Sequence, residues 1–125
     1  MAGAVLRSDE EAFVEQRQAG AAFAATGAAL ISGSNATLAR FELKKGCVVP
    51  MHHHTNGQLT WVVEGCLRFT WPGGEPIDVR SEEVLVIPPE VPHAAEALED
   101  TVVTDVFSPA RDDWASGNDA YLRGK

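Results

Sequence analysis

The segment from Gly46 to Gly65 has the sequence GCVVPMHHHTNGQLTWVVEG, and it holds three of the four histidines of the chain. On an extended strand, the imidazoles of His52 and His54 point to the same face. Gln58 follows in strand-like sequence, and the remaining histidine, His93, comes much later. Imidazole nitrogens and an amide oxygen form the donor set of a cage for a divalent transition metal. The sequence therefore predicts one metal ion held by His52, His54, Gln58 and His93.

A plainer interpretation of the segment is a polar loop that is rich in histidine, or an expression tag. A tag would be terminal, whereas this cluster is internal and flanked by strand-like sequence. Metal binding is therefore the favoured interpretation. By the same alternation of faces, His53 points away from its two neighbours. We therefore expect its side chain to be exposed, or to contact a metal ligand without binding the metal itself.

The rest of the chain predicts an all-β domain. Short stretches rich in β-forming residues are separated by Gly, Pro, Asp or Glu, and we expect strands at residues 37–43, 48–54, 58–63, 66–71, 77–79, 84–87, 93–97 and 101–107. Many short strands with turns between them are typical of a sandwich or a barrel. The Ala-rich residues 19–31 favour helix by propensity, but glycines interrupt them, and we expect two short strands there.

The two ends of the chain have a different pattern. Residues 8–18 begin with a serine and acidic residues, which predicts a helical turn. Ser108 followed by Pro109 has the form of an N-cap and a first-turn proline, which predicts a short helix through Trp114. The chain of 125 residues has the size of one domain. We expect N-terminal strands or an arm at residues 1–33, the metal motifs within 46–93, and a helical tail at 108–125.

Composition narrows the class of protein. A formal net charge of −8 argues against nucleic acid as a partner, since phosphate binding needs a basic surface. The sequence has no apolar run of membrane-spanning length and no signal-peptide pattern, so we expect a cytoplasmic protein that does not enter a membrane. In that setting Cys47 and Cys66 are expected to be reduced and buried.

The motif spacing resembles that of the cupin family. The first cupin motif, G-x5-HxH-x3-E-x6-G, matches from Gly46 to Gly65, with Gln58 in place of glutamate. The second, P-x-G-x-x-H, matches residues 88–93, with Glu90 in place of glycine. The resemblance implies a single-domain cupin, a double-stranded β-helix or jelly-roll barrel, that binds Ni, Zn, Mn or Fe. The neutral amide of Gln58 would leave a bound ion its full charge, which favours binding of an anion.

A second group of residues follows the last predicted strand. From the local sequence alone, we expect Asp105 to be an edge residue and Arg111 an exposed charge. If the side chain of Asp105 instead faces a barrel interior, it could act as a general acid or base beside the metal. Arg111 could then bind a substrate carboxylate through two parallel hydrogen bonds. Together with the metal motifs, this group resembles the small cupins of pectin degradation, the KdgF family, which implies pocket roles for Asp105, Phe107 and Arg111.

That resemblance also implies an activity. These small cupins act on uronates released by pectate and alginate lyases, converting a cyclic 4,5-unsaturated uronate to the linear 4-deoxy-5-keto-uronate. The expected partner is thus a small anionic sugar, the enzyme class an isomerase or lyase, and the assembly a homodimer. Other chemistries stay open for a cupin: a dioxygenase that uses a redox metal, a cyclase or lyase on another small molecule, or a non-catalytic protein that binds a sugar or anion.

Overall fold

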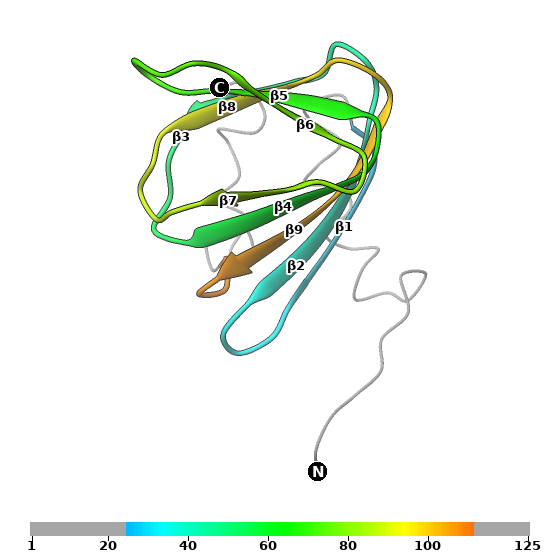
Figure 1. Ribbon diagram of the computed structural model, residues 1–125. Coiled ribbons are helices and arrows are strands. Elements are labelled where there is room, and N and C mark those ends of the chain that lie inside the picture. The colour runs from blue at the N-terminus through cyan, green and yellow to red at the C-terminus, as the bar shows by residue number, and fades with distance from the viewer. Residues whose placement is uncertain (1–24, 112–125) are drawn as a thin grey trace.

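The computed structural model describes residues 25–111, which form nine β-strands and no helix (Figure 1). In chain order the strands are β1 (Ala25–Ser32), β2 (Thr37–Leu43), β3 (Val48–His52), β4 (Gly57–Glu64), β5 (Cys66–Thr70), β6 (Ile77–Arg80), β7 (Val84–Ile87), β8 (His93–Ala97) and β9 (Thr101–Ser108). Since no described residue is helical, residues 25–111 contain no helix that could cross a membrane.

The strands form two antiparallel sheets that face each other. One sheet has the order β1-β2-β9-β4-β7 and the other the order β3-β8-β5-β6. In Figure 1 the five-stranded sheet lies below the four-stranded one, and the chain crosses repeatedly between them. Two sheets with crossovers of this kind make a jelly roll, so the predicted all-β jelly-roll fold is confirmed.

The predicted strand positions hold from residue 37 onward. β2, β7 and β8 have the bounds that the sequence predicts, while β3 ends at His52 because the chain bends toward β4. The expectation of two short strands at residues 19–31 is tested only from residue 25 onward. There a single strand, β1, continues through Gly27, with a shift in the pairing with β2 between Ala25 and Gly27. Residues 19–24, and the helical turn predicted at 8–18, lie outside the described residues.

The core lies between the two sheets and follows from alternation along the strands. β2 alternates strictly between buried and exposed side chains, and β9 alternates between buried and half-buried ones. The buried apolar residues are Leu30, Ala39, Phe41, Leu43, Cys47, Val62, Leu67, Phe69, Val79, Ile87, Ala97, Val103 and Phe107. Cys47 and Cys66 are free and buried, as predicted, and burial raises the pKa of both thiols.

The helix predicted to begin at Ser108 is wrong for the part that the structure describes. Ser108 is the last residue of β9 and pairs with Gly57 of β4, and its hydroxyl donates to the Asn35 carbonyl. Because its backbone and side chain are committed to the sheet end, Ser108 does not cap a helix. Residues 109–111 are irregular, and the rest of the predicted helix lies outside the described residues.

Two glycines of the segment 46–65 have left-handed backbone conformations. Gly46 has a φ of 90° in the turn before β3, and a Cβ atom there would meet open space. Gly65 has a φ of 95° between β4 and β5, and its Cβ would lie 2.5 Å from both the Asp100 carbonyl oxygen and the Thr101 Oγ1 atom. Gly46 is therefore required for backbone conformation alone, and Gly65 also for close packing.

Candidate metal centre

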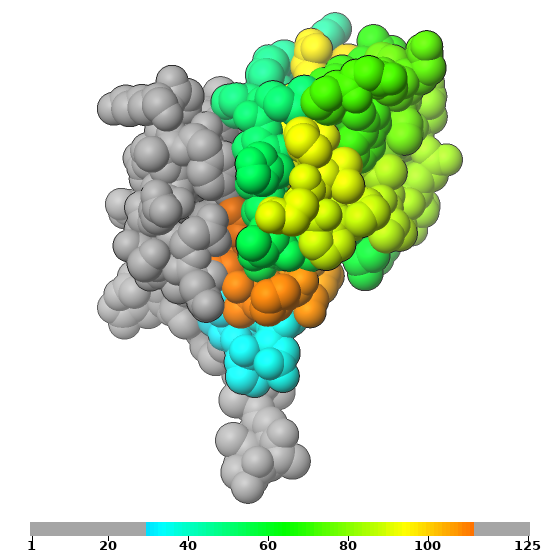
Figure 2. Space-filling view, turned by 90° about the vertical axis from the view of Figure 1, so that its left-hand side faces the viewer, coloured from blue at the N-terminus to red at the C-terminus, as the bar shows by residue number. Residues whose placement is uncertain are grey.

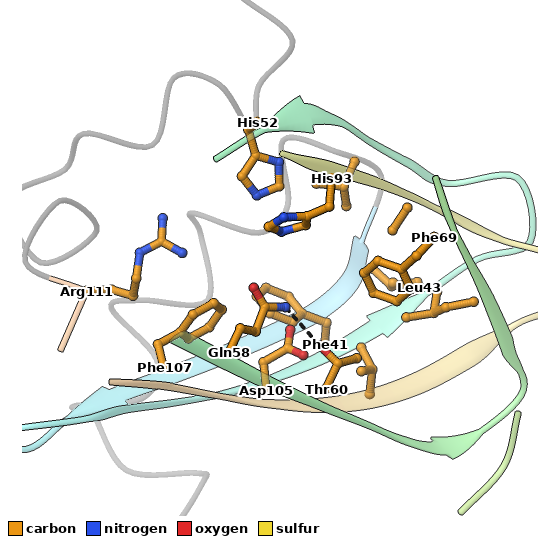
Figure 3. A pocket seen from close by; sticks show the side chains of 14 residues that line it. Phe41, Leu43, His52, Gln58, Thr60, Phe69, His93, Asp105, Phe107 and Arg111 are labelled. Carbon is orange, nitrogen blue, oxygen red and sulfur yellow. Dashed lines mark hydrogen bonds between the residues drawn. The ribbon is translucent and has the colours of Figure 1, made fainter. Parts of the chain in front are cut away.

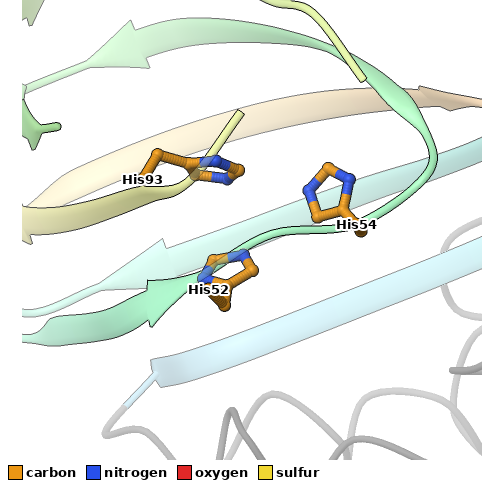
Figure 4. Close-up of side chains that lie close together, drawn as sticks. All are labelled: His52, His54 and His93. Carbon is orange, nitrogen blue, oxygen red and sulfur yellow. The ribbon is translucent and has the colours of Figure 1, made fainter. Parts of the chain in front are cut away.

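Three histidine rings converge at one end of the jelly roll (Figure 4). His52 ends β3 and is the register partner of His93, which begins β8, while His54 lies in the loop that leads to β4. Their ring centroids are 4.4 to 5.6 Å apart, and one ligand atom from each lies within 4.8 Å of the others. The structure thus brings together the three predicted imidazoles from two separate parts of the sequence.

Backbone carbonyls fix the tautomer of each ring. In every case the Nδ1 atom lies within hydrogen-bond distance of a carbonyl two residues away: 2.7 Å for His52 to Pro50, 3.0 Å for His54 to Asn56, and 2.8 Å for His93 to Val91. A carbonyl oxygen only accepts, so Nδ1 carries the proton and Nε2 keeps its lone pair. Hydrogen bonds of this kind orient histidine ligands around metals.

The histidines are also held neutral. Burial away from water lowers the pKa of His52 and of His54 to about 4, and it lowers the pKa of His93. The positive charge of Arg111 acts in the same direction on all three rings. At neutral pH the three Nε2 atoms are therefore free of protons, which is the state that binds metal.

Gln58 lies beside the histidine cluster with its amide oriented by Thr60. Its Nε2 group donates to the Thr60 Oγ1 atom at 2.8 Å, which turns the Oε1 atom toward His54 Nε2 at 3.1 Å. In the tautomer fixed by the Asn56 carbonyl, both of these facing atoms are acceptors without a proton between them. Two lone pairs so placed suit a cation, and the donor set as a whole fits a divalent transition metal.

Beside the histidines, a cavity of about 60 Å³ extends between the two sheets. Two groups of polar side chains face each other across it (Figure 3), with His52 and His93 on one side and Gln58, Thr60 and Asp105 on the other. The remaining walls are apolar except for Arg111, and they are formed by Phe41, Leu43, Val49, Leu67, Phe69, Ala95, Val103, Phe107 and Arg111. Figure 2 shows this end of the molecule, where green, yellow and orange segments that are distant in the sequence meet.

Asp105 is an interior residue of the cavity. β9 lies between β2 and β4, so the interpretation of Asp105 as an edge residue is wrong. Its side chain is buried, and its Oδ1 atom has no hydrogen-bond partner among the described residues. Burial raises the pKa of Asp105 to about 6, against hydrogen bonds from Thr60 and Gln58 and the charge of Arg111, which lower it. The cavity therefore contains a carboxyl group that can take up or release a proton near neutral pH.

Arg111 is also inside rather than exposed. It is only 1% exposed and lines the cavity, and its guanidinium carbon lies 4.8 Å from the centre of the Phe107 ring. The Phe107 ring in turn meets His54 edge to face, with centroids 5.6 Å apart. The interpretation of Arg111 as a surface charge is thus wrong, and a cation stacked on an aromatic ring lies next to the histidine cluster.

His53 points away from the cluster, as the alternation predicts. It is exposed, and its Nδ1 atom lies 3.5 Å from a carboxylate oxygen of Glu90. Glu90 takes the place of the glycine of the second cupin motif, and it has a left-handed φ of 67°. His53 is thus the one histidine of the HHH run that lies outside the cluster, beside Glu90 at the surface.

Two residues of the site were not singled out from the sequence. Thr60 shares the inward face of β4 with Gln58, a spacing of two residues that could have identified it. Asn56 is buried, and its Nδ2 group donates to the carbonyls of Pro109 and Ala110. Nothing in the local sequence signals a contact over that separation.

In metal-free protein, we expect Asp105→Asn to raise the free energy of unfolding near pH 8. The folded-state pKa of about 6 lies above the ordinary value of 3.8, so wild-type stability falls as pH rises through this window. The neutral amide avoids the buried charge, and the gain should be on the order of 3 kcal/mol at most above pH 6 and absent below pH 4. Urea unfolding in the presence of a chelator, across this pH range, measures the difference.

The matched control for that variant is Asp78→Asn, which removes the same formal charge. The pKa of Asp78 is lowered by its hydrogen bond from Arg68, so its removal should not stabilise the protein at high pH. An equal gain in both variants would show that net charge, and not burial of Asp105, is responsible.

A family model described as a cupin domain matches residues 39–107 of the chain. No curated protein matches it at the sequence level. Among solved structures, an RmlC-like cupin from Shewanella frigidimarina NCIMB 400 is 25% identical, with 70% of this chain and 79% of that chain covered and a TM-score of 0.64. KdgF from Halomonas sp. is 29% identical, with 70% and 82% covered and a TM-score of 0.64.

A more distant similarity concerns the fold alone. Oxalate decarboxylase from Bacillus subtilis, a protein with Mn(II) centres, is 22% identical, with 66% of this chain and 25% of that chain covered and a TM-score of 0.61. The matched residues 39–107 include the three histidines as well as Gln58 and Asp105. The range of the family match thus covers the whole described site except Arg111.

Proposed function

The chain belongs to the cupin domain family. Within this family, we propose that it is a metal-dependent enzyme that converts 4,5-unsaturated uronates to linear 4-deoxy-5-keto-uronates. One observation carries the proposal: two histidines of the three-histidine cluster, a buried carboxyl group and a buried guanidinium line the same cavity. The similarity to KdgF from Halomonas sp. supports it at 29% identity.

We assign the metal to His52, His54, His93 and Gln58. The opposed acceptors of Gln58 and His54, 3.1 Å apart, support the amide as the fourth ligand. When bound, a divalent ion at this site supplies Lewis-acid stabilisation of negative charge on substrate oxygen, and polarisation of this kind needs no redox change. Because all four ligands are neutral, the ion keeps its full charge, which strengthens the binding of an acidic sugar in a protein of net charge −8.

The reaction is an isomerisation that the chain can serve with one proton carrier. The C1–O5 bond of the hemiacetal breaks as one proton leaves O1 and one is added to O5, which yields an aldehyde at C1 and an enol at C5. Protonation at C4, with loss of the enol proton, then gives the C5 ketone. We assign the proton transfer to Asp105, whose buried Oδ1 atom lies in the cavity opposite the histidines.

Arg111 and Phe107 would orient the sugar. A guanidinium presents a planar pair of donors that matches a carboxylate, and in this buried position it is shielded from competing water. Phe107 would offer an aromatic surface to the sugar ring, and its ring also packs against the guanidinium of Arg111. The apolar remainder of the cavity excludes water from the enol.

An ultraviolet assay tests the proposal. The metal-loaded protein is incubated with an unsaturated galacturonate monomer, and the loss of enol absorbance is compared with the spontaneous decay. We expect a rate well above background for the wild type and a decrease of about 100-fold or more for Asp105→Asn. Asp78→Asn, the surface control, should keep the wild-type rate.

Two results would contradict the assignment in different ways. A wild-type rate equal to the spontaneous decay would exclude the uronate activity. Equal rates for wild type and Asp105→Asn would keep the activity but remove Asp105 from the proton transfer. A decay that requires oxygen would instead indicate the dioxygenase alternative.

A further inference from the structure

Asn56 is hydrogen-bonded both to His54 and to the segment that carries Arg111, although it belongs neither to the histidine cluster nor to the cavity lining. It lies in the loop between β3 and β4 and is 5% exposed. Its backbone carbonyl accepts the hydrogen bond from His54 Nδ1 at 3.0 Å. Its side-chain Nδ2 group donates to the Pro109 carbonyl at 2.5 Å and to the Ala110 carbonyl at 3.3 Å. One residue thus fixes a metal-facing imidazole and the segment that carries Arg111.

We propose that Asn56 is a positioning residue that places the Arg111 guanidinium beside the metal site, so that the two positive groups bind one carboxylate together. The inference rests on the anion-binding role proposed above for Arg111. It adds that this role depends on a hydrogen bond to a residue that is distant in sequence.

The need for such a residue follows from where Arg111 lies. β9 ends at Ser108, so Arg111 is three residues beyond the last ladder contact, in irregular chain that the sheet does not hold. Backbone carbonyls at such a position require donors, and Asn56 supplies two N–H groups to two of them. The Arg111 amide is fixed separately, since it donates to the Thr37 Oγ1 atom at 2.7 Å.

The two anchors come from different elements of the fold. Asn56 belongs to the loop between β3 and β4, whereas Thr37 begins β2 and accepts a hydrogen bond from the Arg111 amide. The guanidinium that results lies 4.8 Å over the Phe107 ring, which itself touches the His54 ring. Small displacements of a substrate-binding group can reduce its effect by about 100-fold, so loss of either anchor should weaken anion binding.

The side chain and the backbone carbonyl of Asn56 have different hydrogen-bond partners, so a substitution of the side chain tests one set of contacts and leaves the other. Asn56→Ala retains the carbonyl that orients His54 and removes only the two donors to residues 109 and 110. Metal affinity should therefore be preserved while anion affinity falls. A residue that merely supported the fold would affect both, or neither.

The experiment uses the full-length protein loaded with Co²⁺, whose visible absorption reports both the cage and its ligands. Glycolate, a small 2-hydroxy carboxylate, is titrated into wild type, Asn56→Ala, Arg111→Gln and the double variant, with ethylene glycol as the neutral probe. We expect Arg111→Gln to weaken glycolate binding by about 10-fold or more and Asn56→Ala by about 3- to 10-fold. Ethylene glycol binding and the spectrum of the ligand-free Co²⁺ protein should stay unchanged.

The double variant decides whether Asn56 acts through Arg111. If it does, Asn56→Ala adds nothing once Arg111 is replaced, and the two effects are not additive. Additive effects, an unchanged glycolate affinity in Asn56→Ala, or no glycolate binding by the wild type would each overturn the proposal. Asn56→Asp keeps the size of the side chain and the backbone carbonyl but removes the two N–H donors, and it should weaken glycolate binding selectively, which provides the same test should Asn56→Ala not fold.

Failure of the uronate assay would leave this experiment interpretable, because glycolate binding does not require turnover. Conversely, a protein with uronate activity and additive effects in the double variant would keep the proposed function and lose only the role of Asn56.

Discussion

Replacing His93 by alanine is expected to reduce the affinity for a divalent transition metal by at least about 100-fold, since loss of a supporting contact alone reduces such affinities 10- to 100-fold. His93 is 2% exposed and is the ligand that β8 contributes, directly opposite His52 in the ladder between β3 and β8. Without it, the cage keeps two imidazoles from a single loop region and no ligand from the second motif. Uronate turnover should disappear with the metal.

The chain offers a matched control for that variant in His53→Ala. His53 belongs to the same HHH run, but it is exposed and lies near Glu90 rather than the other rings. Metal content after dialysis against a competing chelator, together with the rise in Tm on adding metal, measures both variants. His53→Ala should behave as wild type. Equal metal binding by His93→Ala and wild type would contradict the assignment of the cage.

The second large effect is expected for Gly65→Ala. The new Cβ atom would lie 2.5 Å from the Asp100 carbonyl oxygen and 2.5 Å from Thr101 Oγ1. Thr101 cannot move away freely, because its hydroxyl is hydrogen-bonded to the backbone of Cys66 and Glu99. This close contact and the left-handed backbone conformation both penalise alanine. We expect the free energy of unfolding to fall by on the order of 4 kcal/mol or more, which is a large part of the stability of an ordinary domain.

Gly46→Ala is the control for this variant, because Gly46 has a similar φ of 90° and open space around the position of a Cβ atom. It should lose only about 1 to 2 kcal/mol, the conformational part of the penalty. Chemical unfolding of the metal-free proteins measures both free energies. If the two alanine variants were equally stable, the contact with Asp100 and Thr101 would not be the reason for glycine at residue 65.

The fold could be predicted where alternation is clean and turns are marked. β2 has the predicted bounds because every second side chain from Thr37 to Leu43 is buried. In β7 the four residues are all apolar, and Val84 and Val86 turn out to be 55% and 65% exposed. Alternation of hydrophobicity cannot assign the buried face when both faces are apolar, so the strand could be predicted but its orientation could not.

The histidine cluster of the candidate metal site could be predicted because most of its residues are close together in the sequence. The HxH pair and Gln58 lie between the end of β3 and the start of β4, and His93 is the only histidine outside the HHH run. Asp105 and Arg111 were ambiguous, since their burial depends on β9 being an inner strand of the sheet. Asn56 could not be found at all, because its partners at residues 109 and 110 become neighbours only in the folded chain.

Ser108 shows how tertiary structure overrides a local signal. Ser-Pro is a common start of a helix, yet here the serine pairs with Gly57 at the end of the sheet, and the carbonyls of the next two residues accept from Asn56. The residues that would form a first helical turn are thus used to place Arg111 in the cavity.

The position of β9 has a consequence for the order of events during synthesis. β9 is the last described strand to leave the ribosome, yet it lies between β2 and β4 and joins them into one sheet. Until residues 101–108 have emerged, β1 with β2 and β4 with β7 can form only separate hairpin-like pairs with open edges. The same strand brings Asp105 to the site. A nascent chain therefore completes its five-stranded sheet and acquires Asp105 in a single late step, and ribosome-bound chains that stop before residue 101 should remain sensitive to protease.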